Sequence, residues 1–161
     1  MPDTYEKLLE DTIEIDAPTD KVWSLVTDVP RMAKWSPQVV RSTVKGGVVR
    51  EGATFTNLNK QGFKRWPTGG KVVRMNAPSA TTPGEFAFRI RENHTVWSFH
   101  LEPTATGGTR LTERRETPDG ISKLSLMLTK VVLGGQDGFT KELQDGIRQT
   151  LERIKAEAEG V

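Results

Sequence analysis

Two charged residues near the end of one predicted strand are the strongest candidates for chemistry. In TRLTERRE (109–116), strand alternation puts Leu111, Glu113 and Arg115 on one face. Leu111 marks that face as the inward one, so a carboxylate and a guanidinium point toward the core. There Glu113 could act as an acid or base, and Arg115 could anchor an anion. The alternatives are an ion pair between the two, contact with the terminal helix, or stacking of Arg115 on Trp97.

The preceding strand is predicted to supply an aromatic wall. In TVWSFHLEP (95–103), Trp97 and Phe99 share one apolar face. An antiparallel hairpin that keeps the two inward faces together places Phe99 opposite Glu113 and Trp97 opposite Arg115. An apolar wall with a few polar groups is the usual composition of a ligand pocket.

Alternation on the other strands extends the candidate lining. The further residues predicted to face this interior are Trp35, Phe55, Asn57, Asn59, Trp66, Phe86 and Phe88. Asn57 and Asn59 share a face with Phe55, and buried asparagines need hydrogen-bond partners that a cavity with ligand or water supplies. The alternatives are that the asparagines lie near an exposed strand end, and that the aromatic residues only pack in the core. Trp35, in a short helix, is expected at the cavity mouth.

Few other residues could do chemistry. His94 falls in a predicted turn and His100 on the outward face, so neither is a well-placed base. The chain has no cysteine and no spacing typical of metal ligands, and its glycine pairs match no nucleotide-binding motif. We therefore expect no metal and no cofactor.

Composition predicts a single globular domain over residues 1–161. The net charge is +2, with 35% hydrophobic and 27% charged residues. The lack of cysteine and of a visible signal peptide favours a cytoplasmic location. No apolar run approaches the roughly 20 residues needed to span a bilayer, so no membrane insertion is expected.

The elements that position these residues follow a clear order. Strands are predicted at 8–16, 39–44, 53–61, 64–75, 85–92, 95–103 and 109–116, with short helices in 16–28 and 28–36 and helical segments at 121–133 and from 139 to about 160. Gly69 and Gly70 predict a bulge. In the last helix, apolar residues at helical spacing should pack on the sheet: Leu143, Ile147, Leu151 and Ile154. Glu142, Lys155 and Glu159 should face solvent.

This order resembles the START-like (SRPBCC) superfamily, in its bacterial polyketide cyclase/dehydrase-like branch. The similar stretches include IEIDAPTDKVWSLVTDVPRMAKWSP (13–37), GATFTNLNKQGFKRWPTGGKVVRM (52–75) and VWSFHLEPTATGGTRLTERRE (96–116). The resemblance implies an α+β helix-grip fold. In that fold a curved antiparallel sheet of about six or seven strands wraps a long C-terminal helix, and two short helices follow the first strand. It also implies a cavity, into which a glutamate at the position of Glu113 points in related receptors.

Three functions are compatible with this sequence. The first is binding of a hydrophobic small molecule, lipid-, polyketide- or aromatic-like, between the sheet and the C-terminal helix. The second is a polyketide cyclase or dehydratase that uses Glu113 as acid or base. The third is a ligand-free interaction module, in which the basic and aromatic stretch 60–74 touches nucleic acid. Alternation spreads those charges over both faces, so no nucleic acid partner is expected. Ligand identity, the protonation state of Glu113 and the choice between monomer and homodimer stay open.

Overall fold

Seven antiparallel strands form one sheet in the order β1-β7-β6-β5-β4-β3-β2. The computed structural model describes residues 8–117 and 136–160, so the helix predicted at 121–133 lies outside the described residues. The strands are β1 (Leu8–Ile15), β2 (Val39–Val44), β3 (Thr54–Gln61), β4 (Lys64–Asn76), β5 (Gly84–Ile90), β6 (Val96–Pro103) and β7 (Thr109–Glu116). The helices are α1 (Thr19–Val26), the short 3₁₀ helix η1 (Val29–Arg31), α2 (Met32–Trp35) and α4 (Gln136–Glu159).

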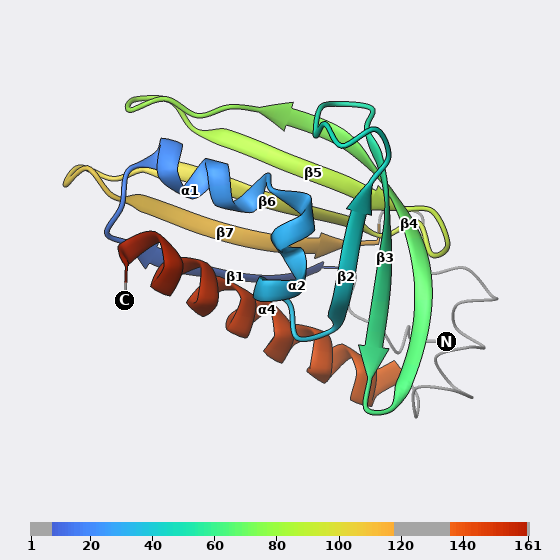
Figure 1. Cartoon of the computed structure of the whole chain (residues 1–161). Helices are drawn as coiled ribbons and strands as arrows, with labels where there is room; N and C mark the ends of the chain where they lie inside the picture. Colours follow the sequence, from blue (N-terminus) through green and yellow to red (C-terminus); the bar gives the residue numbers. More distant parts are fainter. Residues whose placement is uncertain (1–7, 118–135, 161) are drawn as a thin grey trace.

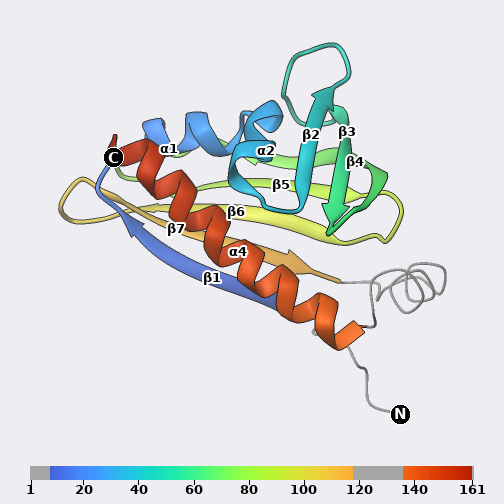
Figure 2. The ribbon, with the colours of Figure 1, turned by 60° about the horizontal axis from the view of Figure 1, so that its bottom comes forward.

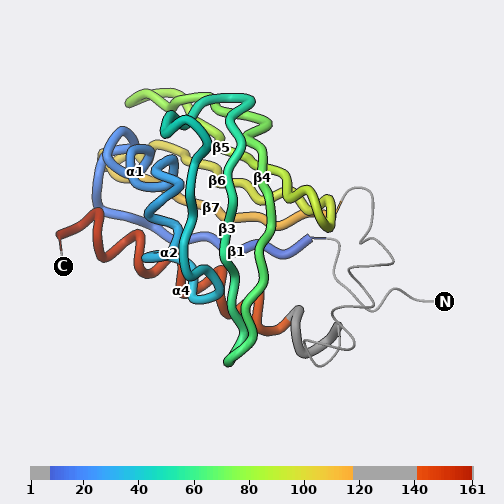
Figure 3. The backbone as a smooth tube through the Cα atoms, turned by 45° about the vertical axis from the view of Figure 1, so that its right-hand side comes forward, coloured from blue at the N-terminus to red at the C-terminus, as the bar shows by residue number. Residues whose placement is uncertain are grey.

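The sheet curves around the long helix α4, which lies along β1 (Figure 1). Helices α1 and α2 lie on the same side of the sheet as α4, and both helices contact α4 (Figure 2). The part of the sheet formed by β2, β3 and β4 bends over the face on which α1, α2 and α4 lie (Figure 3). The predicted α+β helix-grip architecture is therefore confirmed. No helix in the described ranges is long and apolar enough to cross a membrane.

One face of α4 is buried against the sheet. The four apolar residues predicted to pack there are all buried: Leu143, Ile147, Leu151 and Ile154. They recur three or four residues apart, which places them on one stripe of an α-helix. This prediction is confirmed.

The companion prediction, that Glu142, Lys155 and Glu159 face solvent, is confirmed only in part. All three are half-buried. Lys155 Nζ donates to the carbonyl oxygen of Glu14 at 2.7 Å and to Glu159 Oε2 at 2.6 Å. The backbone N–H of Asp16 also donates to Glu159 Oε2, at 2.7 Å. These polar side chains therefore fasten the helix to the end of β1, which helical spacing alone does not reveal.

The bulge predicted at Gly69 and Gly70 is also wrong. Both glycines pair with β3 without a shift in register, and the irregularity lies between Val72 and Arg74, against β5. Glycine is needed at position 70 because a Cβ atom there would lie 2.4 Å from Cζ of Phe55. Gly70 thus makes room for an aromatic ring in the core.

Candidate functional site

The β6–β7 hairpin has the predicted register. Phe99 pairs with Glu113 and Trp97 pairs with Arg115. Glu113 is 6% exposed and Arg115 is 3% exposed, so both of these charged side chains lie inside the protein. The inward face of β7 is therefore the one that alternation identified.

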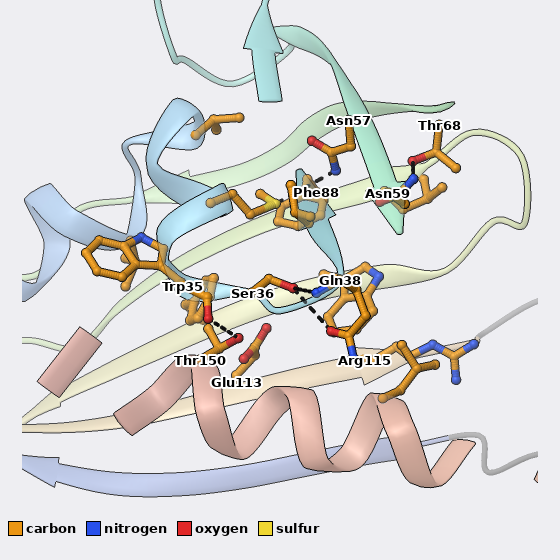
Figure 4. Close-up of a pocket in the computed structure, with 18 of the residues that line it drawn as sticks. Trp35, Ser36, Gln38, Asn57, Asn59, Thr68, Phe88, Glu113, Arg115 and Thr150 are labelled. Atoms are coloured by element: carbon orange, nitrogen blue, oxygen red, sulfur yellow. Dashed lines mark hydrogen bonds between the residues drawn. The ribbon is translucent and has the colours of Figure 1, made fainter. Parts of the chain in front are cut away.

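These two side chains face a cavity of about 130 Å³ between the sheet, α2 and α4 (Figure 4). Nine of the predicted residues line it: Trp35, Asn57, Asn59, Trp66, Phe88, Trp97, Phe99, Glu113 and Arg115. Trp35 is only 5% exposed and so forms part of the buried wall. The structure thus brings together side chains from β3 to β7 and from the second short helix.

Phe55 and Phe86 do not line the cavity. Both are buried behind it, where Phe55 packs edge-on against Phe88 at a centroid distance of 5.2 Å. Phe86 lies 6.2 Å from Phe88 and 6.3 Å, edge-on, from Trp23. These two residues therefore follow the alternative in which aromatic side chains only pack in the core, and both pack against the ring of Phe88.

The asparagines obtain their partners from neighbouring strands. Asn57 Oδ1 accepts a hydrogen bond from Ser42 Oγ at 2.6 Å. Asn59 Nδ2 donates to the carbonyl oxygen of Trp66 at 3.1 Å and to Thr68 Oγ1 at 2.9 Å. Both asparagines line the cavity, but these protein contacts already use their polar atoms in part.

Two side chains at the cavity each carry a buried polar atom without a hydrogen-bond partner among the described residues. These atoms are Glu113 Oε1 and Arg115 Nη1. Neither Glu113 nor Arg115 forms an ion pair with a described residue, so the predicted alternative of a mutual ion pair is not seen. A buried polar atom without a partner costs free energy, and this cost is removed when a bound molecule supplies the partner.

Burial shifts the pKa of each charged group in the direction that favours its neutral form. It raises the pKa of Glu113 well above its usual value, so this carboxyl keeps its proton at pH values where an exposed glutamate is ionised. It lowers the pKa of Arg115 to about 10, which leaves the guanidinium charged at neutral pH. The Glu113 carboxyl and the Arg115 guanidinium can then both donate hydrogen bonds. The site suits a ligand that carries acceptor oxygens.

The raised pKa of Glu113 has a measurable consequence for stability. Above the unfolded-state pKa of about 4.3, the unfolded chain loses this proton while the native state keeps it, so native stability falls as pH rises. Glu113→Gln removes this loss. We expect the stability advantage of the variant to grow by up to about 1.4 kcal/mol per pH unit, until the native pKa is passed.

Urea denaturation of both proteins between pH 4 and pH 8 measures this difference. Glu116→Gln, on the same strand, is the control and should follow the wild-type curve to within about 0.5 kcal/mol. Parallel curves for Glu113→Gln and wild type would show that the carboxyl titrates normally.

Sequence reasoning missed several residues at the cavity. Thr150 lines it, and its Oγ1 donates to the carbonyl oxygen of Trp35 at 3.2 Å, which joins α4 to α2. A signal existed, because position 150 follows Ile147 by three residues and falls on the buried stripe of the helix. Gln38 also lines the cavity, and its Nε2 donates to the carbonyl oxygen of Glu142 at 3.1 Å. Nothing in the pattern around Gln38 marks it.

The histidines lie away from the cavity. His94 is exposed, with a φ of 62°, in the turn between β5 and β6. His100 contacts Ser98 Oγ at 2.9 Å on the outer face of the sheet, and burial lowers its pKa. In the described part of the chain, no group of three His, Asp or Glu residues could hold a metal ion. The charged side chains that line the cavity are Asp28, Glu113 and Arg115, and Asp28 is already paired with Arg31 at 2.9 Å.

Fold and cavity together define a class of protein. Residues 8–159 match the model of the family described as polyketide cyclase / dehydrase and lipid transport. The chain belongs to this family, which confirms the resemblance inferred from the sequence. No curated protein matches the sequence.

Solved structures of this class share the fold. The polyketide cyclase-like protein Cgl2372 from Corynebacterium glutamicum is 24% identical, with a TM-score of 0.62 over 98% of this chain and 97% of that one. The ZhuI aromatase/cyclase from Streptomyces sp. R1128 is 15% identical, with a TM-score of 0.63 over 94% and 93%. The di-domain aromatase/cyclase StfQ from the steffimycin biosynthetic pathway is 14% identical, with a TM-score of 0.68. This match covers 96% of this chain and 51% of StfQ, so the chain spans about half of that protein's length.

Proposed function

We propose that the protein binds a mostly apolar small molecule whose polar end carries acceptor oxygens, in the cavity between the sheet and α4. The observation that carries this proposal is the buried guanidinium of Arg115, which is charged and has an unpartnered Nη1 beside an aromatic wall. An anionic or carbonyl oxygen of a ligand would give this atom the charge-assisted hydrogen bond that it lacks. Phe88, Phe99 and Trp97 would contact the apolar part of the ligand.

The size of the cavity limits the ligand. A protein cavity of about 150 Å³ holds a benzene molecule, so this cavity of about 130 Å³ accommodates about one ring. The lining residues Asn59, Trp66 and Trp97 are half-exposed, so a larger ligand would extend toward them. Small aromatic acids are therefore suitable probes.

The proposal is tested by calorimetric titration with 2-naphthoate and with 2-naphthamide, which has nearly the same shape but no charge. One ring of each probe fills the cavity, and the second would extend toward the half-exposed Trp97. We expect saturable binding of both at one molecule per chain, with 2-naphthoate the tighter because it pairs with Arg115. Binding of neither probe, or binding that does not saturate, would count against a ligand site in this cavity.

A second candidate function is acid catalysis by Glu113. A carboxyl that keeps its proton in an apolar site can protonate a leaving hydroxyl group, and the carboxylate that results can accept the proton lost from the neighbouring carbon, as a dehydratase requires. A one-ring test substrate is 4-hydroxy-4-phenylbutan-2-one, which loses water to form a conjugated ketone with a strong ultraviolet band. Glu113→Gln should abolish this reaction while the affinity for 2-naphthamide is kept, and wild type without turnover would favour binding alone.

A further inference from the structure

The turn between β3 and β4 exposes a large aromatic side chain. Gln61 pairs with Lys64, so Gly62 and Phe63 form a two-residue hairpin turn. Phe63 is 90% exposed, the highest value among the exposed large hydrophobic residues of the described ranges. Gly62 has a φ of +60° and thus supplies the left-handed conformation that such turns need. Neither turn geometry nor packing therefore accounts for the phenylalanine.

Three basic residues lie on the two strands next to the turn that carries this aromatic side chain. Lys60, Lys64 and Arg65 flank the turn, and none of them forms an ion pair with a described residue. Arg65 Nη1 donates to the carbonyl oxygens of Gly62 at 2.8 Å and of Lys64 at 3.0 Å, so its guanidinium lies against the turn. The tip of the hairpin thus presents one apolar side chain among three positive charges.

A carboxylate close to the tip is already engaged. Gln61 Nε2 donates a short hydrogen bond to Glu142 Oε2, which fastens the end of the hairpin to α4. This contact leaves the three cations available to an outside partner and holds the tip in place.

We propose that the β3–β4 tip, defined as Lys60 to Arg65, docks on an anionic bilayer surface. Phe63 enters the boundary between head groups and acyl chains, and Lys60, Lys64 and Arg65 bind the negative head groups. Docking of this kind needs no membrane-spanning segment. Asn59 and Trp66 pair directly behind the tip and line the cavity, so docking would place the cavity next to the bilayer.

The charge distribution favours a bilayer over nucleic acid. The basic stretch is interrupted along β4, because Trp66, Pro67, Thr68, Gly69 and Gly70 separate Arg65 from the exposed Lys71, and Arg74 Nε lies 2.9 Å from Glu85 Oε1 in an ion pair. Trp66, the other aromatic residue of the stretch, lines the cavity and so is directed inward. Single-stranded nucleic acid is bound along a basic groove with several stacking rings, whereas a bilayer needs only a compact basic tip with an apolar point.

The size of the expected effects follows from the typical contributions of single residues to membrane association. A basic residue at an anionic membrane surface contributes about fivefold to the association constant, and burial of a phenylalanine side chain contributes about 10- to 100-fold. Together, the four residues support half-maximal binding at lipid concentrations on the order of 0.1–1 mM.

Co-sedimentation of the full chain with lipid vesicles tests this proposal. We expect binding to vesicles of equal parts phosphatidylglycerol and phosphatidylcholine, and at least about 100-fold weaker binding to phosphatidylcholine alone. Phe63→Ala should weaken binding about 10-fold or more, and Phe63→Leu should retain most of it. Val48→Ala is the matched control, since Val48 is 64% exposed in the loop at the other end of β3 and should not contribute.

Because Phe63 is exposed, its variants should melt at the wild-type temperature. Wild-type protein that does not bind anionic vesicles, or Phe63→Ala that binds as wild type does, would overturn the proposal. Oligonucleotide binding that is tighter than vesicle binding and weakened by Phe63→Ala would also overturn it, in favour of nucleic acid. The assay needs no ligand in the cavity, so its result is independent of the proposed binding function.

Discussion

Leu151→Ala is expected to lower the free energy of unfolding by about 2–5 kcal/mol. Leu151 has no exposed surface and lies on the stripe by which α4 packs on the sheet. Its truncation removes buried apolar contacts and leaves a cavity that the curved sheet can only partly close. Urea denaturation followed by circular dichroism measures the change. This loss is a large fraction of the total stability, because native proteins are stable by only about 5–15 kcal/mol.

Glu152→Ala is the matched control on the same helix. Glu152 is exposed and pairs with Arg148 at 2.9 Å, an interaction worth about 0.3–0.5 kcal/mol in a helix. This variant should therefore stay within about 0.5 kcal/mol of wild type. If both substitutions change the free energy of unfolding by the same small amount, α4 does not pack on the sheet through Leu151.

Arg115→Met is expected to weaken the binding of 2-naphthoate by about 10- to 150-fold. The side chain keeps its apolar stem but loses the guanidinium, and a charge-assisted hydrogen bond contributes about 1.5–3 kcal/mol. The affinity for 2-naphthamide should change much less, because the amide carries no charge. Calorimetric titration of the same preparation with both probes gives the ratio directly.

Arg114→Met is the control for this experiment. Arg114 is the next residue on β7, points to the outer face and pairs with Glu10 at 2.7 Å. It should leave the affinities for both probes unchanged. Equal weakening of both probes by Arg115→Met would show that the guanidinium shapes the cavity without recognising charge. Loss of folding in Arg115→Met, with Arg115→Lys folded and binding both probes alike, would assign it a structural role.

Strand and helix positions followed from the sequence because each element has one buried face. Alternation identified the inward face of β7 from Leu111 alone, and parity then gave the pairing of Phe99 with Glu113. On α4, apolar residues three or four positions apart identified Leu151 and its neighbours as buried. Each pattern shows which side chains are buried when the protein folds. A regular helix or strand places those side chains on one face.

Periodicity could not assign depth or partners. Phe55 and Phe88 both point inward, but only Phe88 reaches the cavity, since Phe55 occupies the space left by Gly70. Lys155 and Glu159 read as surface residues, yet they bond to β1, from which they are more than 100 positions distant in sequence. Such contacts depend on how distant segments meet in space.

We propose that Arg115 holds the polar end of a ligand inside this cavity. A crystal structure of the protein with 2-naphthoate tests this role at the level of single atoms. We expect a carboxylate oxygen about 2.7–2.9 Å from Arg115 Nη1, with the rings against Phe88 and Trp97. A naphthoate bound elsewhere on the protein, or bound in the cavity with its carboxylate turned away from Arg115, would show that Arg115 does not recognise the ligand.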